Sequence, residues 1–124
     1  MNIRPERVAQ FMRREIAEIL EHRLNDPRLA GLVVSVTDVE VTRDLSSAKV
    51  FVSVLETGET RTNALAALQS AVGFVRHLLS SRLELREVPE IRFLHDTSIE
   101  RGARVEELLR KLAHGESVPD EELP

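Results

Sequence analysis

Residues 60–85, TRTNALAALQSAVGFVRHLLSSRLEL, carry the pattern that decides how this 124-residue chain folds. Apolar residues recur at helical spacing along the whole stretch, which predicts helix. Gly73 stands near the middle, where glycine costs a continuous helix about 1 kcal/mol relative to alanine. A tight bend, in contrast, can use the backbone freedom of glycine and the close approach that it allows. The stretch therefore predicts two short helices that meet at a kink over Ala71, Val72 and Gly73.

The segment before this stretch predicts a helix and a strand hairpin. Apolar residues over 5–24 share one face of an amphipathic helix, which should end at Asp26-Pro27 because the residue before proline avoids the helical region. Residues 32–43 are rich in β-branched side chains and predict a strand, as do residues 48–55. The short polar connector between them makes the pair an antiparallel hairpin.

The valines of the first strand change parity along its length. Val34 and Val36 fall on one face of the strand, whereas Val39 and Val41 fall on the other. An extra residue in one strand shifts the two-residue alternation by one position. We therefore expect a β-bulge near residues 37–38, which brings the two faces into agreement.

The segment after the helix pair predicts a third short strand over 91–95 and a last helix over 98–113. This helix is expected to bury five apolar residues: Ile99, Val105, Leu108, Leu109 and Leu112.

Two pairs of residues are candidate helix caps. Thr60 or Thr62 can cap the first helix of the pair. Thr97 and Glu100 match a capping box before the last helix, with Thr97 as N-cap and Glu100 reaching back to it.

The expected order is α-β-β-α-α-β-α, an α+β fold in which helices cover one face of a three-stranded sheet. Its first six elements have the order of a type II KH domain, a fold that clamps a nucleic-acid backbone with a Gly-containing turn. We expect a single KH-like domain over residues 1–115 and a disordered acidic tail over 116–124.

The charges are distributed unevenly along the chain. The net charge is -4, but four of the 21 acidic residues lie in the tail, so the rest of the chain is balanced by its 17 Lys and Arg. Arg outnumbers Lys by 15 to 2. Arginine suits phosphate binding and base stacking. A GC-rich genome or a surface laced with ion pairs would give the same bias, and both explanations stay open.

The composition also indicates where the protein works. No cysteine is present, which excludes disulfide frameworks and thiolate zinc sites. The N-terminus has no apolar signal-peptide core, and no stretch approaches the length of a membrane span. We expect a soluble, cytoplasmic protein that does not contact membranes.

Residues of catalytic type are present, but their spacing does not suit catalysis. The four histidines lack metal-ligand spacing, and no phosphate-binding or dinucleotide-binding loop is present. The run His95-Asp96-Thr97-Ser98 contains triad residue types, yet triad partners normally come from separate segments. Asp96 and Thr97 are explained as helix-start signals. We therefore expect no enzyme, no cofactor and no metal site.

The kink and the helix that follows it form the candidate RNA-binding site. A helix N-terminus directed at phosphate offers free N–H groups and a favourable dipole. The candidate residues are Ala71, Val72, Gly73, Arg76, His77, Ser80, Arg82 and Arg86. Because the chain has no Tyr or Trp, we expect shape and backbone contacts to dominate over stacking. A surface helix with a few arginines is the alternative explanation.

Several blocks of the chain, spread in order over residues 3–112, resemble the ribosome-binding factor A family. They are the opening RVAQFMRREIAEIL, the hairpin VTDVEVTRDLSSAKVFVSVL, the Ala71-Val72-Gly73 kink and the block VPEIRFLHDTSIERGARVEELL. The resemblance implies a type II KH fold in which an Ala-x-Gly kink, here Ala71 and Gly73, replaces the usual GxxG loop. It places Arg76, Arg82 and Arg86 on the helix that follows the kink.

The resemblance also implies a function. It implies a non-enzymatic assembly factor that binds the free small (30S) ribosomal subunit and its 16S rRNA. Such a factor assists late maturation, including processing of the rRNA 5′ end, and is needed most at low temperature. The implied partners are the small subunit and an assembly GTPase that triggers release, and the free protein is expected to be a monomer. A protein-protein interaction module without RNA binding stays open as the alternative.

Overall fold

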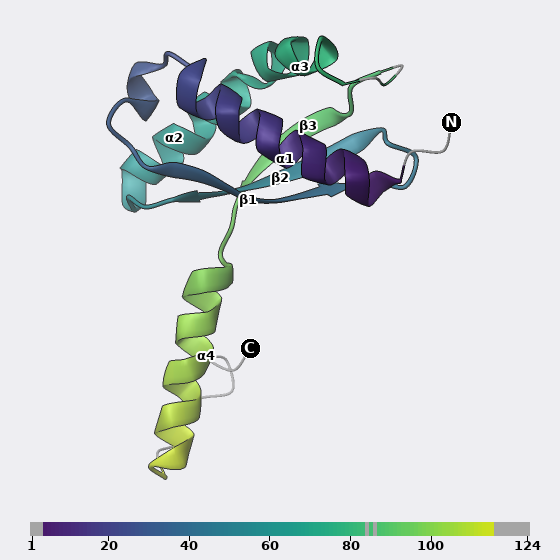
Figure 1. Ribbon diagram of the computed structural model, residues 1–124. Coiled ribbons are helices and arrows are strands. Elements are labelled where there is room, and N and C mark those ends of the chain that lie inside the picture. Colours follow the sequence, from purple (N-terminus) through teal and green to yellow (C-terminus); the bar gives the residue numbers. More distant parts are fainter. Residues whose placement is uncertain (1–3, 84, 86, 116–124) are drawn as a thin grey trace.

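The computed structural model describes residues 4–83, 85 and 87–115 (Figure 1). The elements, in chain order, are α1 (Pro5–His22), the short 3-10 helix η1 (Pro27–Leu29), β1 (Val34–Val41), β2 (Ser47–Val54), α2 (Gly58–Ser70), α3 (Val72–Ser80), β3 (Glu90–His95) and α4 (Ser98–Ala113). The predicted order of helices and strands is confirmed. The acidic tail predicted over 116–124 lies outside the described residues.

The three strands form one sheet in the order β1-β2-β3, with β1 antiparallel and β3 parallel to β2. Helices α1, α2 and α3 cover one face of this sheet, and α4 extends away from the other side (Figure 1). The predicted α+β architecture is therefore confirmed, with three of its four described helices in the layer on the sheet.

The predicted bulge in β1 is also confirmed. Val36 pairs with Val52 and Asp38 pairs with Phe51, so Thr37 is the extra residue. Because of this shift, the valines on both sides of the bulge point towards the helices and pack in or against the core.

The core lies between the sheet and the helices α1, α2 and α3. Its buried members are Val8, Met12, Ile16, Ile19, Val39, Ala48, Val50, Val52, Leu68, Val75, Leu79, Ile91 and Phe93. Among the described residues, none of these comes from α4.

The bend between α2 and α3 occurs at Ala71, as predicted, but its cause differs from the prediction. Ala71 ends α2 and precedes α3 with φ -87° and ψ -1°, right-handed angles whose ψ departs from the value of about -42° in a regular α-helix. Its N–H donates to the carbonyls of Ala67 and Leu68 at 3.1 and 3.0 Å, and its own carbonyl accepts from Val75 N at 2.9 Å. Gly73 lies inside α3, and no neighbouring atom lies within 4 Å of the position that a Cβ would take there. The bend therefore requires neither a left-handed glycine nor a close backbone approach.

The predicted caps of α2 were wrong. The helix begins at Gly58 with Thr57 in the N-cap position, two residues before Thr60. Gly58 has φ +64°, so the chain enters the helix through a left-handed residue that favours glycine. Thr62 lies one turn into α2, where its Oγ1 donates to the carbonyl of Gly58 at 3.3 Å.

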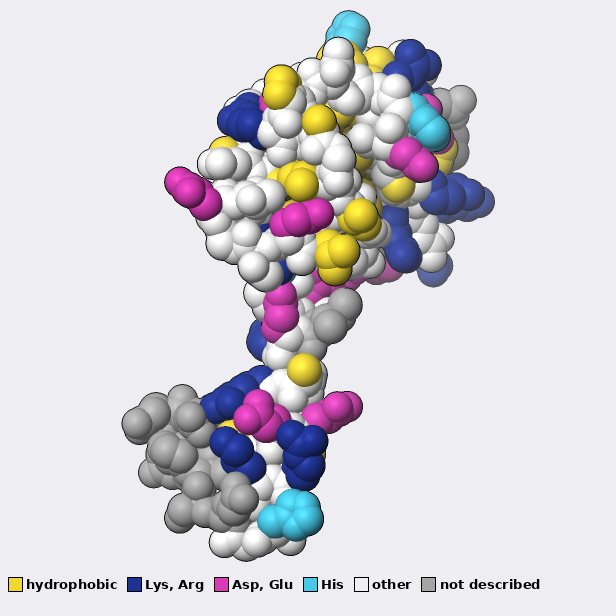
Figure 2. All heavy atoms as spheres, turned by 90° about the vertical axis from the view of Figure 1, so that its left-hand side faces the viewer, with side chains coloured by type: hydrophobic (Ala, Val, Ile, Leu, Met, Phe, Trp, Pro, Cys, Tyr) yellow, Lys and Arg dark blue, Asp and Glu magenta, His cyan; other side chains and the backbone are white. Residues whose placement is uncertain are grey.

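The predicted burial of the apolar side of α4 was wrong in part. α4 projects from the body of the protein, with basic and acidic side chains interspersed along it (Figure 2). Leu109 and Leu112 are 60% and 50% exposed. Leu108 is buried and Val105 half-buried, whereas the burial of Ile99 falls outside the described side chains.

The capping box at the start of α4 is not formed. Thr97 occupies the N-cap position, but its side chain makes no capping hydrogen bond. Asp96 takes that role instead, since its Oδ1 accepts from Ser98 N at 2.8 Å. Glu100 turns away from the helix start and accepts from Arg61 Nη2 at 3.2 Å.

Within residues 4–83, 85 and 87–115, no helix combines the length and the apolar composition that a membrane span requires.

Candidate nucleic-acid interface

The three kink residues, Ala71, Val72 and Gly73, differ in solvent exposure. Ala71 and Val72 are half-buried, and Val72 packs against the core. Gly73 is exposed, with open space above its Cα. The surface of the kink is therefore bare backbone at Gly73, which a ligand can approach closely.

The side chain of Arg76, one turn after the bend, points towards the backbone that precedes β3 and not into solvent. Its Nε donates to the carbonyl of Pro89 at 3.1 Å, and its Nη2 donates to the carbonyl of Val88 at 2.8 Å. The side chain is half-buried. Arg76 thus satisfies two backbone acceptors of the segment that leads from α3 into β3.

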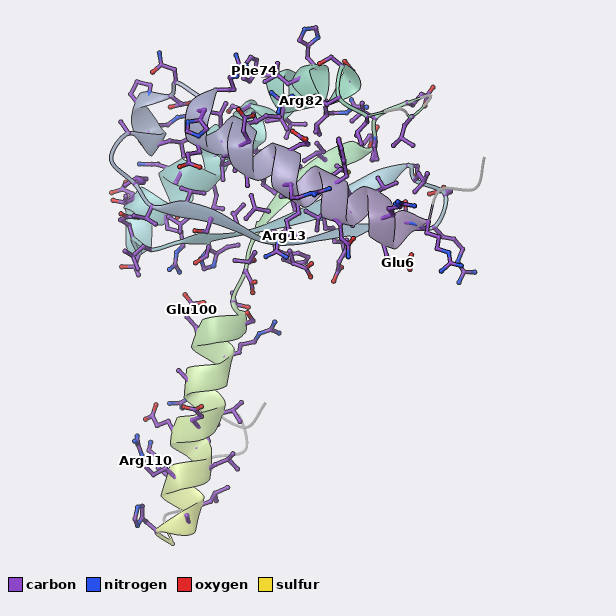
Figure 3. All side chains as sticks on the ribbon, in the orientation of Figure 1. Glu6, Arg13, Phe74, Arg82, Glu100 and Arg110 are labelled. Atoms are coloured by element: carbon purple, nitrogen blue, oxygen red, sulfur yellow. The ribbon has the colours of Figure 1, made fainter. Side chains whose placement is uncertain are left out.

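Arg82, in the turn after α3, joins this turn to α1. Its Nη1 lies 2.9 Å from Glu15 Oε2 and 2.8 Å from Glu18 Oε2, and its side chain is 23% exposed. The hydrogen bond from Arg82 lowers the pKa of Glu18, and the two carboxylates in turn raise the pKa of Arg82. Figure 3 shows Arg82 between the two helices. Its charge is therefore matched within the protein.

The remaining predicted residues include two at the surface. His77 and Ser80 are both exposed, and Ser80 Oγ donates to the carbonyl of His77 at 2.6 Å. Arg86 lies outside the described residues. Of the predicted set, the structure thus brings Gly73, His77 and Ser80 together on the exposed side of α3, while Arg76 and Arg82 have internal partners.

Phe74 is a surface residue of α3 that lies outside the predicted set. It is 44% exposed, whereas the other three phenylalanines are buried or half-buried. Figure 3 shows it at the start of α3, on the outer side of the helical layer. The helical phase of α3 could have indicated this, because Phe74 falls outside the stripe formed by Val72, Val75 and Leu79.

Two exposed arginines of α1 are also candidates for an RNA contact. Arg7 and Arg14 are exposed, and in the described part of the chain neither has an ion-pair partner. They are seven residues apart, so they share one side of the helix, and Glu18 follows Arg14 by one turn. Because Glu18 contacts Arg82, this side of α1 lies next to the turn after α3 at Glu18.

We call the exposed residues of these two helices the α1–α3 face: Arg7 and Arg14 from α1 and Gly73, Phe74, His77 and Ser80 from α3. It combines free positive charge, an exposed aromatic ring and bare backbone. The charge can bind RNA phosphates, and the aromatic ring can stack on a base. The bare backbone lets an RNA strand approach closely.

The chain is similar to proteins of one family over most of its length. The family model described as Ribosome-binding factor A matches residues 4–109. Ribosome-binding factor A of Trichormus variabilis is 44% identical over 119 residues, 96% of this chain and 90% of the relative. That of Thermosynechococcus vestitus is 44% identical over 114 residues, 92% and 90% of the two chains.

Solved structures give the same match. The crystal structure of ribosome-binding factor A from Thermus thermophilus has a TM-score of 0.64 and 28% identity, covering 73% of this chain and 93% of its own. A homology model of the Thermus thermophilus factor, fitted into the cryo-EM map of a 30S-RBFA complex, has a TM-score of 0.59 and 29% identity, covering 72% of this chain and 91% of its own. The chain belongs to the ribosome-binding factor A family.

Proposed function

We propose that this chain is a non-enzymatic assembly factor that binds the free small (30S) ribosomal subunit through its 16S rRNA. The observation that carries the proposal is its family membership, together with the relative that has been fitted into a map of a 30S complex. The exposed features of the α1–α3 face support it, because phosphates, bases and a close backbone approach are what an rRNA surface offers.

The α1–α3 face is the proposed contact surface. Arg7 and Arg14 supply charge that no described neighbour neutralises, and Gly73 lets a phosphate approach the first turn of α3. Arg76 and Arg82 contribute by holding α3 in place, through the carbonyls of the α3–β3 segment and through α1. A rigid face of this kind recognises the shape and the sugar-phosphate backbone of the RNA, which is the binding mode expected of a KH-like domain.

The proposed mechanism is a shift of population and involves no chemical step. A factor that binds one rRNA conformation better than another raises the population of the first by its difference in affinity. We propose that the favoured conformation is the one that maturation enzymes accept, including those that process the 16S rRNA 5′ end. At low temperature rRNA leaves misfolded states more slowly, so the factor should be needed most under those conditions. An assembly GTPase that reverses the preference would release it, and the free factor acts as a cytoplasmic monomer.

Co-sedimentation with purified subunits tests this proposal. The protein is expected to pellet with free 30S subunits and much less with joined ribosomes, and its binding should weaken as salt rises. Arg7→Glu combined with Arg14→Glu should weaken binding at least tenfold. Lys49→Glu combined with Arg92→Glu is the matched control, because these two exposed residues are paired neighbours on the sheet and carry the same charge change. Absence of binding at low salt would overturn the function, and equal loss in both variants would overturn the face.

A second candidate function is a protein-binding module. The observation that favours it is the exposed apolar side of α4, where Leu109 and Leu112 are 60% and 50% exposed. If this were the main activity, Leu109→Ser with Leu112→Ser would abolish subunit binding, and purified 16S rRNA without protein would not bind. The RNA-binding function predicts the opposite result in both measurements.

A further inference from the structure

A hollow lies beside the kink, where the end of α1 meets the α2–α3 bend. Its volume is about 290 Å³. One wall comes from the segment after α1 and the other from the two helices of the kink, and the lining residues are Arg23, Leu24, Asn25, Asp26, Ala67, Ser70, Ala71 and Phe74. The two walls are more than forty residues apart in sequence, so the hollow exists only in the folded protein.

The hollow combines an aromatic ring with small neighbours. Phe74 is 44% exposed and is the one exposed phenylalanine of the chain. Ala67 and Ala71 leave the floor beside the ring free of bulky side chains. A flat aromatic ligand can therefore lie against Phe74, as nucleobases do on exposed aromatic residues.

The charge of the hollow is positive, because its carboxylate is already paired. Asp26 Oδ1 accepts from Arg28 N and Nε at 2.9 and 3.1 Å, and its Oδ2 lies 2.9 Å from Arg28 Nη2. Glu18, one turn before the hollow, is paired with Arg82. Arg23 is exposed, and within the described ranges it has no ion-pair partner. Its guanidinium is therefore available to a phosphate.

Two polar side chains that line the hollow can contact a base edge. Asn25 is exposed, and its side-chain amide offers both a donor and an acceptor. Ser70 Oγ donates to the carbonyl of Ala66 at 2.9 Å, which leaves its lone pairs free to accept from a base amino group. A nucleotide site needs three parts: an aromatic ring on which the base stacks, a cation that binds the phosphate, and a polar group that contacts the edge of the base.

We propose that this hollow binds one unpaired nucleotide of rRNA, with its base on Phe74 and its phosphate at Arg23. The inference rests on the proposed function, because it names the kind of RNA element that the kink recognises. Only a base outside a helical stack can present its face to Phe74, so the site selects a loop, bulge or strand end over duplex RNA. It also adds a recognition element on the side of the kink that faces the end of α1.

The test uses the full chain and short single-stranded oligoribonucleotides with a fluorescent label, because the protein has no Tyr or Trp to report binding. Phe74→Leu keeps an apolar side chain without the aromatic face, and Arg23→Gln removes the charge. Each is expected to weaken binding about tenfold. Arg43→Gln, an exposed arginine on the β1–β2 connector, is the control and should bind like the unchanged protein. Circular dichroism checks that all three variants are folded.

A second measurement locates the ligand. The amide NMR signals of Asn25, Ser70 and Ala71 should shift with the single strand and stay in place with a duplex of the same sequence. Unchanged affinity in both variants, or signals that do not move, would overturn the site. Equal shifts with a free nucleoside monophosphate would show a small-molecule site and would also overturn the rRNA assignment.

The two proposals fail in different experiments. If Phe74→Leu and Arg23→Gln bind oligonucleotides and 30S subunits like the unchanged protein, the hollow has no role but the assembly function stands. If the unchanged protein does not pellet with 30S subunits at low salt, the assembly function itself is wrong.

Discussion

Thr37 Oγ1 donates a hydrogen bond of 2.6 Å to Asp96 Oδ2 and so ties the bulge of β1 to the residue that follows β3. The bond joins the two edge strands across β2, which lies between them. The other oxygen of Asp96 accepts from Ser98 N at 2.8 Å and fixes the start of α4. One carboxylate therefore connects the bulge, the sheet and the direction in which α4 leaves it.

This bond predicts an acid-sensitive contribution to stability. The hydrogen bonds from Thr37 and Ser98 lower the pKa of Asp96 from 3.8 to about 2. Because the folded-state pKa lies below the unfolded one, the stabilisation is fully present above about pH 4 and is lost as pH falls towards about 2. Thr37→Val should lower the urea midpoint at neutral pH, and the difference from the unchanged protein should shrink below pH 4. Thr60→Val, at an exposed position of α2, is the control. A difference independent of pH would show that Asp96 is not the partner that matters.

Gly73→Ala separates the structural role of the kink from its role in binding. Because Gly73 is helical and its Cβ position is open, alanine should stabilise the protein by about 0.5 to 1 kcal/mol. The added methyl group lies where a phosphate would approach α3, so affinity for 30S subunits should fall. Gly102→Ala is a matched control, since Gly102 also lies in a helix with no atom within 4 Å of the position that a Cβ would take. Gly102→Ala should give a similar gain in denaturant stability and leave subunit binding unchanged. Loss of folding in Gly73→Ala would contradict the role of Ala71 as the bend.

The parts of the structure that the sequence predicted depend on local patterns. The parity change of the valines located the bulge, because side-chain alternation along a strand is set by neighbouring residues. Gly73, a glycine within a helical pattern, located the bend between α2 and α3 to within two residues, although the bend itself is at Ala71. The partners of Arg82 lie 67 and 64 residues away, so no local pattern could show that its charge is matched. Amphipathicity predicted that α4 is a helix, but an apolar side does not reveal what it packs against.

Arg82 and Arg14 are expected to affect subunit binding in different ways. Arg82→Gln removes the contact with Glu15 and Glu18 and should lower stability, because it leaves two carboxylates without their cation. Since Arg82 lowers the pKa of Glu18 from 4.5, the effect should be present above about pH 4.5 and fade as pH falls below it. Arg14→Gln should leave stability unchanged and reduce the slope of log affinity against log salt by about 1. Thermal melting and salt titration of subunit binding distinguish the two variants. A reduced salt slope of subunit binding in Arg82→Gln would show that Arg82 contacts a phosphate.

Arg76→Lys tests whether Arg76 acts on the protein and not on RNA. A lysine keeps the charge but cannot form the two-pronged contact with the carbonyls of Val88 and Pro89. The loss should lower the free energy of unfolding by about 1 to 2 kcal/mol, as expected for two hydrogen bonds. The salt slope of subunit binding should stay the same because the positive charge remains. A stability equal to that of the unchanged protein would mean that the α3–β3 segment does not depend on this contact.

Removing most of α4 should leave the rest of the protein folded. A chain that ends at Arg101 keeps the Asp96–Ser98 contact and the 3.2 Å pair of Arg61 with Glu100. No described residue beyond this point belongs to the core cluster, and the buried Leu108 lies outside that cluster, so the sheet and the helices α1, α2 and α3 should stay folded, with little change in the free energy of unfolding. Chemical denaturation followed by circular dichroism measures this change. Subunit binding through the α1–α3 face should also persist, and a shortened chain that is folded but no longer binds would place an essential contact on α4.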